Sequence, residues 1–268
     1  MTRWIGTVLW LLTVVTGSAA ADSLATIKQR GTLVCGVKDS LPPFGYVDAK
    51  TRQIVGYDID ICKAIADRLG VRMELKPVTS AARVPQLKEG NVDLIAATMT
   101  KTPERAKEID FSHTYFVTGQ KFLVRKGTVR SLKDMAGKKI GTAKGSTSEQ
   151  NAKKAIPDAT ILSFDDYPQA FLALNQGKVV AVTTDEAILA GIRAKAPKPE
   201  AYEILDERLS DEPYGLGLRK GDTALLAEVN KTLLELERSG EAKRLFEKWF
   251  GPRSAAPLKR TFTITADK

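Results

Sequence analysis

Short apolar runs alternate with amphipathic patterns along this chain, and this alternation constrains its fold more than any other feature. Near the amino-terminal end, strand-like runs at residues 32–37, 71–75 and 93–97 are separated by helical patterns at residues 57–69 and 84–88. The order strand, helix, strand, helix, strand predicts a parallel sheet covered by helices. We therefore expect an α/β fold.

The same alternation restarts in the second half of the chain. Helical patterns separate four further strand-like runs, at residues 120–125, 139–143, 161–163 and 179–184. An extended run at residues 214–218 precedes a long amphipathic helix at residues 223–238 and a final helix that ends before Gly251. A second sheet is therefore expected, which makes two α/β lobes.

The amino terminus has a different composition. Arg3 precedes an apolar run at residues 5–15, and small residues follow at 17–21. This pattern predicts a secretory signal peptide over residues 1–21. The run is shorter than the roughly 20 apolar residues that a membrane span needs. We expect a soluble, exported protein.

Two cysteines bear on the same compartment. Cys35 lies in the strand-like sequence LVCGV, and Cys62 lies on the apolar face of the predicted helix at residues 57–69. An exported protein can form a disulfide between them. Two unpaired core cysteines that pack as small apolar groups are the alternative. The sequence leaves this choice open.

The net charge of +9 does not indicate a nucleic-acid partner. The lysines are spread along the helices, and aromatic residues make up only 7% of the chain. Nucleic-acid binding would require a basic patch with interleaved aromatic residues. A basic, exported protein can instead attract small anions.

Polar side chains follow directly on five of the predicted strands. Ligands of open α/β sheets bind beyond the carboxyl ends of the strands, so these side chains predict a polar cleft between the lobes. Each of them has an alternative interpretation as a helix cap or a solvated side chain. The residues are Lys38, Ser80 with Arg83, Thr98 with Thr100 and Arg105, Ser146 with Thr147, and Asp185.

This set of side chains suits a free amino acid. Arg105 offers two parallel donors to a carboxylate, and the helix that begins near Ser146 and Thr147 offers backbone amides. Asp185 can accept from an ammonium group. An amino-acid ligand is therefore predicted.

Signatures of enzymes are few. The chain has one histidine, His113, which argues against a metal cluster or a Ser-His-Asp arrangement, and it has no phosphate loop. We expect no cofactor, no metal site and no catalytic residue. We also expect no spare carboxylate in the cleft that could act as a general acid or base.

Several motifs together resemble one family across nearly the whole exported chain. The sequence resembles the bacterial extracellular solute-binding proteins of family 3, the periplasmic receptors of ABC transporters for polar amino acids. The motifs are PPFGYVD, GYDIDICKAIADRLG, TKTPERAKEIDFS, KGSTSE, TTDEAILAG, YGLGLRKGD and SGEAKRLFEKWFG.

The resemblance implies a type II periplasmic-binding fold in which the chain crosses twice between two lobes. It places lobe 1 at residues 22–115 plus 216–268 and lobe 2 at residues 116–215. Hinges are expected near residues 116–119 and 212–215. The implied partner is the membrane permease of an ABC transporter, and we expect a monomer.

The resemblance also implies roles for single residues. Arg105 would hold the ligand α-carboxylate with help from Thr100 and the amide of Thr147. Thr98 and Asp185 would receive the ammonium group, and Phe44 would flank the ligand.

Within the family, the segments PVTSAARVPQLKEG and AGIRAKAPKP are most similar to glutamate/aspartate-binding proteins. Ser80 and Arg83 correspond there to groups that bind a side-chain carboxylate. Lys38 and Tyr167 stand where that subgroup often has an arginine and a histidine. Glutamate or aspartate is therefore the expected ligand. The alternatives are another polar amino acid, such as glutamine, and an enzyme resembling the periplasmic dehydratases of cyclic acids.

Overall fold

The computed structural model describes residues 23–267. The predicted signal peptide, residues 1–21, lies outside the described residues. No helix in the described range combines the length and the apolar character needed to cross a membrane.

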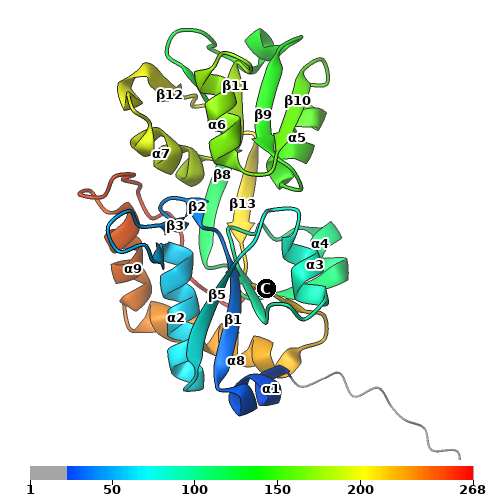
Figure 1. Cartoon of the computed structure of the whole chain (residues 1–268), viewed down its shortest axis with the longest axis vertical. Coiled ribbons are helices and arrows are strands. Elements are labelled where there is room, and N and C mark those ends of the chain that lie inside the picture. Colours follow the sequence, from blue (N-terminus) through cyan, green and yellow to red (C-terminus); the bar gives the residue numbers. More distant parts are fainter. Residues whose placement is uncertain (1–22, 268) are drawn as a thin grey trace, which may run out of the picture.

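The first sheet has five strands and forms the core of lobe 1, the lower part of the molecule in Figure 1. Its order is β5 (Arg72–Pro77), β1 (Thr32–Val37), β6 (Leu94–Ala96), β14 (Gly217–Arg219) and β7 (Ile109–Phe111). β1 is parallel to β5 and β6, as the alternation predicts. β14 is antiparallel to β6 and β7, so the whole sheet is mixed.

The helices of lobe 1 come from both ends of the chain. They are α1 (Ser23–Arg30), α2 (Tyr57–Leu69), α3 (Arg83–Lys88), α4 (Pro103–Glu108), α8 (Thr223–Arg238) and α9 (Glu241–Phe250). α2 has the predicted bounds and ends at Gly70, which adopts the left-handed conformation that favours glycine. Its buried face, which includes Ile61 and Ile65, packs into the core.

The second sheet has six strands and forms lobe 2, the upper part in Figure 1. Its strands are β10 (Thr160–Phe164), β9 (Lys139–Ala143), β11 (Ala181–Asp185), β8 (Phe116–Arg125), β12 (Tyr202–Ile204) and β13 (Ser210–Tyr214). β9 is parallel to β10 and β11, whereas β8 is antiparallel to β11, β12 and β13. The helices are α5 (Thr147–Ala155), α6 (Tyr167–Asn175), α7 (Glu186–Lys195) and two 3₁₀ helices (Leu132–Met135 and Pro199–Ala201).

The predicted loop after β1 contains a short strand. β2 (Ser40–Leu41), β3 (Gly45–Val47) and β4 (Ile54–Val55) form a small antiparallel sheet. Two prolines follow β2 and limit it to two residues, because proline has no backbone donor for a ladder.

Two paired strands connect the lobes. β8 and β13 run side by side between the two sheets in Figure 1, with Phe116 opposite Tyr214 and Gln120 opposite Ser210. The chain then returns to lobe 1, because β14 belongs to the first sheet. Of the segments where we expect hinges, residues 116–119 lie on β8 and residues 212–214 lie on β13.

An aromatic cluster packs around the start of β8. The ring of Phe116 lies 5.0 Å from that of Phe44, 5.1 Å from Phe250, 5.4 Å from Tyr57 and 5.7 Å from Tyr214, measured between centroids. Aromatic pairs at these separations add to the stability that burial gives. The cluster joins the first crossing strand to α2 and α9 of lobe 1.

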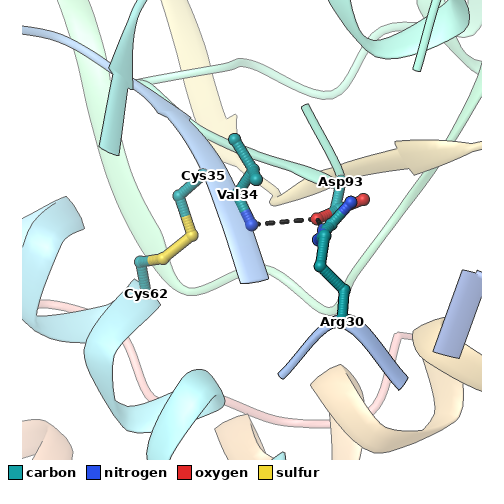
Figure 2. Close-up of a disulfide and its surroundings, with 5 residues drawn as sticks. All are labelled: Arg30, Val34, Cys35, Cys62 and Asp93. Atoms are coloured by element: carbon teal, nitrogen blue, oxygen red, sulfur yellow. Dashed lines mark hydrogen bonds and ion pairs between the residues drawn. A yellow bond between two sulfur atoms is a disulfide. The ribbon is translucent and has the colours of Figure 1, made fainter. Parts of the chain in front are cut away.

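A disulfide joins Cys35 on β1 to Cys62 on α2 (Figure 2). The two Cα atoms are 6.7 Å apart. The structure thus resolves the open choice in favour of the bonded pair. Next to Cys35, the amide of Val34 donates to Asp93 over 2.9 Å, and Asp93 also pairs with Arg30 of α1. β1 is therefore fixed covalently to α2 and by a carboxylate to the residues before β6.

We expect the double variant Cys35→Ala/Cys62→Ala to lose about 3 to 4 kcal/mol of unfolding free energy. The bond links residues 27 apart and restricts the unfolded chain. Urea unfolding without reductant would measure the loss, and reduced wild-type protein should match the variant. Complete alkylation of both thiols in unreduced wild-type protein would contradict the bond itself.

Candidate ligand-binding site

Most of the predicted site residues lie where strands end and face the other lobe. Lys38 follows β1, Ser80 and Arg83 follow β5, Thr98 and Thr100 follow β6, and Arg105 lies on α4. From lobe 2, Ser146 and Thr147 begin α5, Tyr167 begins α6 and Asp185 ends β11. Phe44 is the exception: its ring has no exposed surface and is part of the aromatic cluster around Phe116.

Arg105 spans the two lobes. Its Nη1 donates to the carbonyl of Thr100 over 2.8 Å, and its Nη2 donates to the carbonyl of Gly145 in lobe 2 over 3.2 Å. Gly145 has a φ of +76°, and a Cβ there would approach Ala81 to 2.7 Å. Glycine is thus needed where the lobes touch. Burial lowers the pKa of Arg105, while Tyr167, Glu212 and Asp185 oppose that shift.

Asp185 is a buried carboxylate with one unused oxygen. Its Oδ2 accepts from the hydroxyl of Tyr214, whereas its buried Oδ1 has no hydrogen-bond partner among residues 23–267. Burial and, secondly, the charge of Glu212 raise the pKa of Asp185 to about 7. A buried acceptor without a donor is costly, so this oxygen suits a donor brought by a ligand.

Arg105 and Asp185 are brought to the same place. Thr100, whose carbonyl binds Arg105, forms an isolated bridge with Tyr214, and Tyr214 donates to Asp185. The two groups also influence each other's pKa, the carboxylate raising that of Arg105 and the guanidinium lowering that of Asp185. The site therefore offers a cation and an acceptor within reach of one small molecule.

Two further cations form a second pole of the site. Lys38 donates to the carbonyl of Val78 over 3.0 Å and to the hydroxyl of Ser80 over 3.1 Å. Arg83 donates only to backbone carbonyls, those of Ser80, Ala97 and Thr98. Burial lowers the pKa of Arg83 to about 9, and burial together with Arg83 holds that of Lys38 well below 10.5.

A cavity of about 150 Å³ opens beside this pole. Both lobes line it, lobe 1 through Lys38 and Ser80 and lobe 2 through Asp166 and Tyr167. Burial and the charge of Asp185 raise the pKa of Tyr167, so its hydroxyl stays protonated and can donate.

The cations of the site have no acidic partners. Within the part of the chain that the structure describes, neither Lys38, Arg83 nor Arg105 forms an ion pair with Asp or Glu within 4.0 Å. Desolvated charges without partners are costly. A bound anion would reduce that cost.

Two hydroxyls of the predicted site already have partners. Ser146 caps α5 by accepting from the amide of Glu149 and donates to the carbonyl of Ala143, which is the alternative interpretation of that residue. Thr98 donates its hydroxyl proton to the carbonyl of Ala97 over 2.8 Å.

Thr98 also has an uncommon backbone conformation, with a φ of +47°. Such a conformation is strained for a β-branched residue and must be held by its neighbours. The buried carboxylate of Asp58 accepts from the Thr98 amide over 2.9 Å, and Arg83 binds the Thr98 carbonyl. Asp58, which sequence reasoning missed, therefore positions Thr98.

One buried carboxylate at the site was not identified from the sequence. Glu212 on β13 is 1% exposed and accepts from the hydroxyls of Thr100 and Thr147. Ser210, Glu212 and Tyr214 alternate along β13, so their side chains share one face of the strand. Because the run SDEPY does not alternate polar with apolar residues, it has no local pattern that would have identified Glu212.

We expect the unfolding free energy of the ligand-free protein to fall as the pH rises from about 5.5 to about 7. Burial raises the pKa of Asp58 and of Asp185 to about 7, so the folded protein binds protons that the unfolded chain has released. Each group changes the free energy by at most about 1.4 kcal/mol per pH unit. Asp185→Asn should make the decline shallower in urea unfolding, whereas the exposed control Asp67→Asn should not. Parallel curves for wild type and Asp185→Asn would contradict this.

The chain is similar in sequence to known proteins of one family. The family model of the bacterial extracellular solute-binding proteins, family 3, matches residues 33–252. A glutamine-binding protein of an ABC transporter from Bacillus subtilis (strain 168) is 42% identical over 233 residues, covering 85% of this chain and 84% of the relative. A glutamate/aspartate import solute-binding protein from Salmonella typhimurium is 35% identical over 244 residues, covering 87% of this chain and 80% of the relative.

The fold is also similar to that of a solved structure. An ancestral arginine-binding protein bound to glutamine matches with a TM-score of 0.79 at 43% identity, covering 83% of this chain and 99% of that protein. The two sheets, the paired crossing strands and the cleft correspond to the type II periplasmic-binding fold. The chain belongs to the bacterial extracellular solute-binding proteins of family 3.

Proposed function

We propose that this protein is the receptor of an amino-acid importer: it binds a free amino acid between its lobes and presents it to the membrane permease of an ABC transporter. The guanidinium of Arg105 and the unpaired Oδ1 of Asp185 are the observation on which the proposal rests. A zwitterion carries complementary charges at adjacent groups. The relatives named as binders of glutamine and of glutamate/aspartate support the same class of ligand.

The α-carboxylate lies, in this proposal, against Arg105 and the first backbone amides of α5, beginning with Thr147. The ammonium group donates to Asp185 Oδ1 and to the hydroxyl of Thr98, whose own proton is committed to Ala97. Charge-assisted hydrogen bonds contribute about 1.5 to 3 kcal/mol each, and micromolar binding needs about 8 kcal/mol. Four or five such bonds give on the order of 6 to 15 kcal/mol before the costs of desolvation and closure, a range that includes this requirement.

The proposed side chain of the ligand is acidic, with glutamate or aspartate as the first candidate. It extends toward Lys38, Ser80, Arg83 and Tyr167, where two buried cations have only neutral partners. A side-chain carboxylate supplies the counter-charge that these cations do not receive from the described protein. Arg83 is held by three backbone carbonyls, including that of Ser80 in the loop after β5. Lys38 has a compact ammonium group on a flexible side chain.

Glutamine is the second candidate, and the relatives are the observation that favours it. The Bacillus subtilis protein named as glutamine-binding is 42% identical, against 35% for the glutamate/aspartate-binding protein. A lysine whose pKa is lowered by burial can also lose its proton and face a neutral amide. Glutamate would therefore require a protonated Lys38, whereas glutamine could bind beside an unprotonated Lys38.

An enzyme of the dehydratase type is not favoured by the site. Its additional carboxylate, Glu212, has both oxygens engaged, by the hydroxyls of Thr100, Thr147 and Ser210 and the amide of Asn151. A general acid or base needs a hydrogen-bonding position that faces the reacting group.

Binding is proposed to proceed by closure of the lobes about hinges near residues 116–119 and 212–215, with lobe 1 at residues 22–115 plus 216–268 and lobe 2 at 116–215. The structure has close contacts between the lobes, for instance at Gly191, where a Cβ would lie 1.8 Å from the carbonyl oxygen of Pro42. A ligand touched by both lobes favours the closed state. The protein is proposed to work as a periplasmic monomer.

Isothermal titration calorimetry with a panel of amino acids tests the ligand class. We expect Lys38→Met to weaken glutamate binding about 10- to 100-fold and glutamine binding much less, because a single charge-assisted bond is lost. Lys63→Met, which removes an exposed lysine of α2, is the matched control. Equal losses for both ligands, or preferential binding of neutral or cationic amino acids by the wild type, would refute the acidic assignment.

Glutamate binding should also be accompanied by proton uptake at a pH where Lys38 of the ligand-free protein is partly deprotonated. Burial holds the pKa of Lys38 well below 10.5, and a carboxylate placed beside it raises that pKa again. Above about pH 8 Asp185, with a pKa of about 7, is already ionised and adds little. The binding enthalpy should therefore depend on the ionisation enthalpy of the buffer, and Lys38→Met should remove this dependence. Glutamine binding without buffer dependence serves as the internal control.

A further inference from the structure

Glu212 joins the lobes at the crossing strands through four neutral donors. Its Oε2 accepts from Thr100 of lobe 1 over 2.6 Å and from Thr147 at the start of α5 over 2.8 Å. Its Oε1 accepts from Asn151 over 3.1 Å and from Ser210. The residue is 1% exposed, and no cation lies within 4.0 Å of it in the described chain.

These bonds fix the direction of two hydroxyls in the site. A threonine hydroxyl has one proton and two lone pairs. Because Thr100 and Thr147 each donate that proton to Glu212, each hydroxyl can only accept from a ligand. An ammonium group can donate to such oxygens, whereas a carboxylate would meet lone pairs and must be bound by backbone amides and guanidinium groups.

The acceptors on this side of the site are grouped near a second carboxylate. Asp185 has a buried, unpaired Oδ1, and Glu212 is the strongest charge that raises the pKa of Asp185. Tyr214, two residues from Glu212 on β13, connects them by donating to Asp185. Two carboxylates and two accepting hydroxyls thus surround one end of the site.

We propose that Glu212 is a positioning residue that makes this end of the site selective for a ligand ammonium group: it holds the Thr100 and Thr147 hydroxyls as acceptors and adds a second negative charge beside Asp185. This inference rests on the proposed function and extends it to ligand selectivity. The protein should discriminate strongly between an α-amino acid and the same acid without its ammonium group.

Calorimetry with matched ligand pairs tests the inference. The pairs are L-glutamate with glutarate and L-glutamine with glutaramate, which differ only in the ammonium group. We expect Glu212→Gln to reduce the preference of the wild type for the amino acid over its deaminated partner about tenfold or more. Glu237→Gln, which removes a carboxylate paired with Arg260 away from the cleft, should leave the preference unchanged.

A second variant keeps the test decisive if Glu212→Gln does not fold, as judged by circular dichroism. Thr147→Val removes one accepting hydroxyl and keeps the backbone amide and the charge of Glu212. It should reduce the preference in the same direction by a smaller factor. Both variants acting on the amino acid and not on its deaminated partner would support the inference.

Two results would overturn it. Equal weakening of both members of a pair would assign Glu212 a structural role only. Tighter binding of the amino acid by Glu212→Gln would show that Glu212 competes with the ligand for the two hydroxyls. Failure of the wild type to bind any of the four probes would instead refute the proposed function, so the two failures are distinguishable.

Discussion

The antiparallel pairing of β8 with β13 is the interaction on which the rest of this structure depends. These strands connect two sheets that otherwise have separate hydrogen-bond ladders. The same pairing places Phe116 in the aromatic cluster below and Glu212 and Tyr214 among the polar groups above. Lobe geometry and site chemistry are therefore set by one short ladder, and a change of register there would disturb both.

The buried carboxylates of the site and its buried cations have different kinds of hydrogen-bond partners. Its carboxylates receive hydroxyl and amide donors, as Asp58 does from Tyr115 and Thr98 and Glu212 does from four neighbours. Its cations are held mainly by backbone carbonyls and form no ion pair with an acidic residue among residues 23–267. Carbonyls orient a guanidinium without neutralising it.

Local patterns in the sequence predict the larger elements well, because their hydrophobic periodicity is long enough to be recognised. α2 and α8 have the predicted bounds, and β1, β5 and β6 form the expected parallel set. The short strands β7 and β12 were not predicted, since three residues do not establish a period. They exist because a neighbouring strand offers each of them a partner, β14 for β7 and the ten-residue β8 for β12.

The residues of the candidate site also divide into those that local sequence patterns indicate and those that they do not. Strand ends point to Arg105 and Asp185, and the structure brings these two together. Glu212 and Asp58 were missed because the partners that bring them to the site, Thr100 and Thr98, lie 112 and 40 residues away in the sequence. The pairing of the cysteines likewise cannot be read from local patterns. Cys35 and Cys62 each fit a buried apolar position, and only the packing of α2 on β1 shows that they meet.

Whether the proposed site prefers a ligand with an acidic or a neutral side chain depends more on the burial of Lys38 and Arg83 than on their residue types. Lys38 next to Arg83 forms a strongly cationic pair only if both keep their protons, yet burial lowers the pKa of each, and a neighbouring cation adds to this, Arg83 for Lys38 and Arg105 for Arg83. A ligand carboxylate restores the proton on Lys38, whereas a ligand amide can accept its loss. In the proposed site, the same side chains can therefore face the side chain of either glutamate or glutamine.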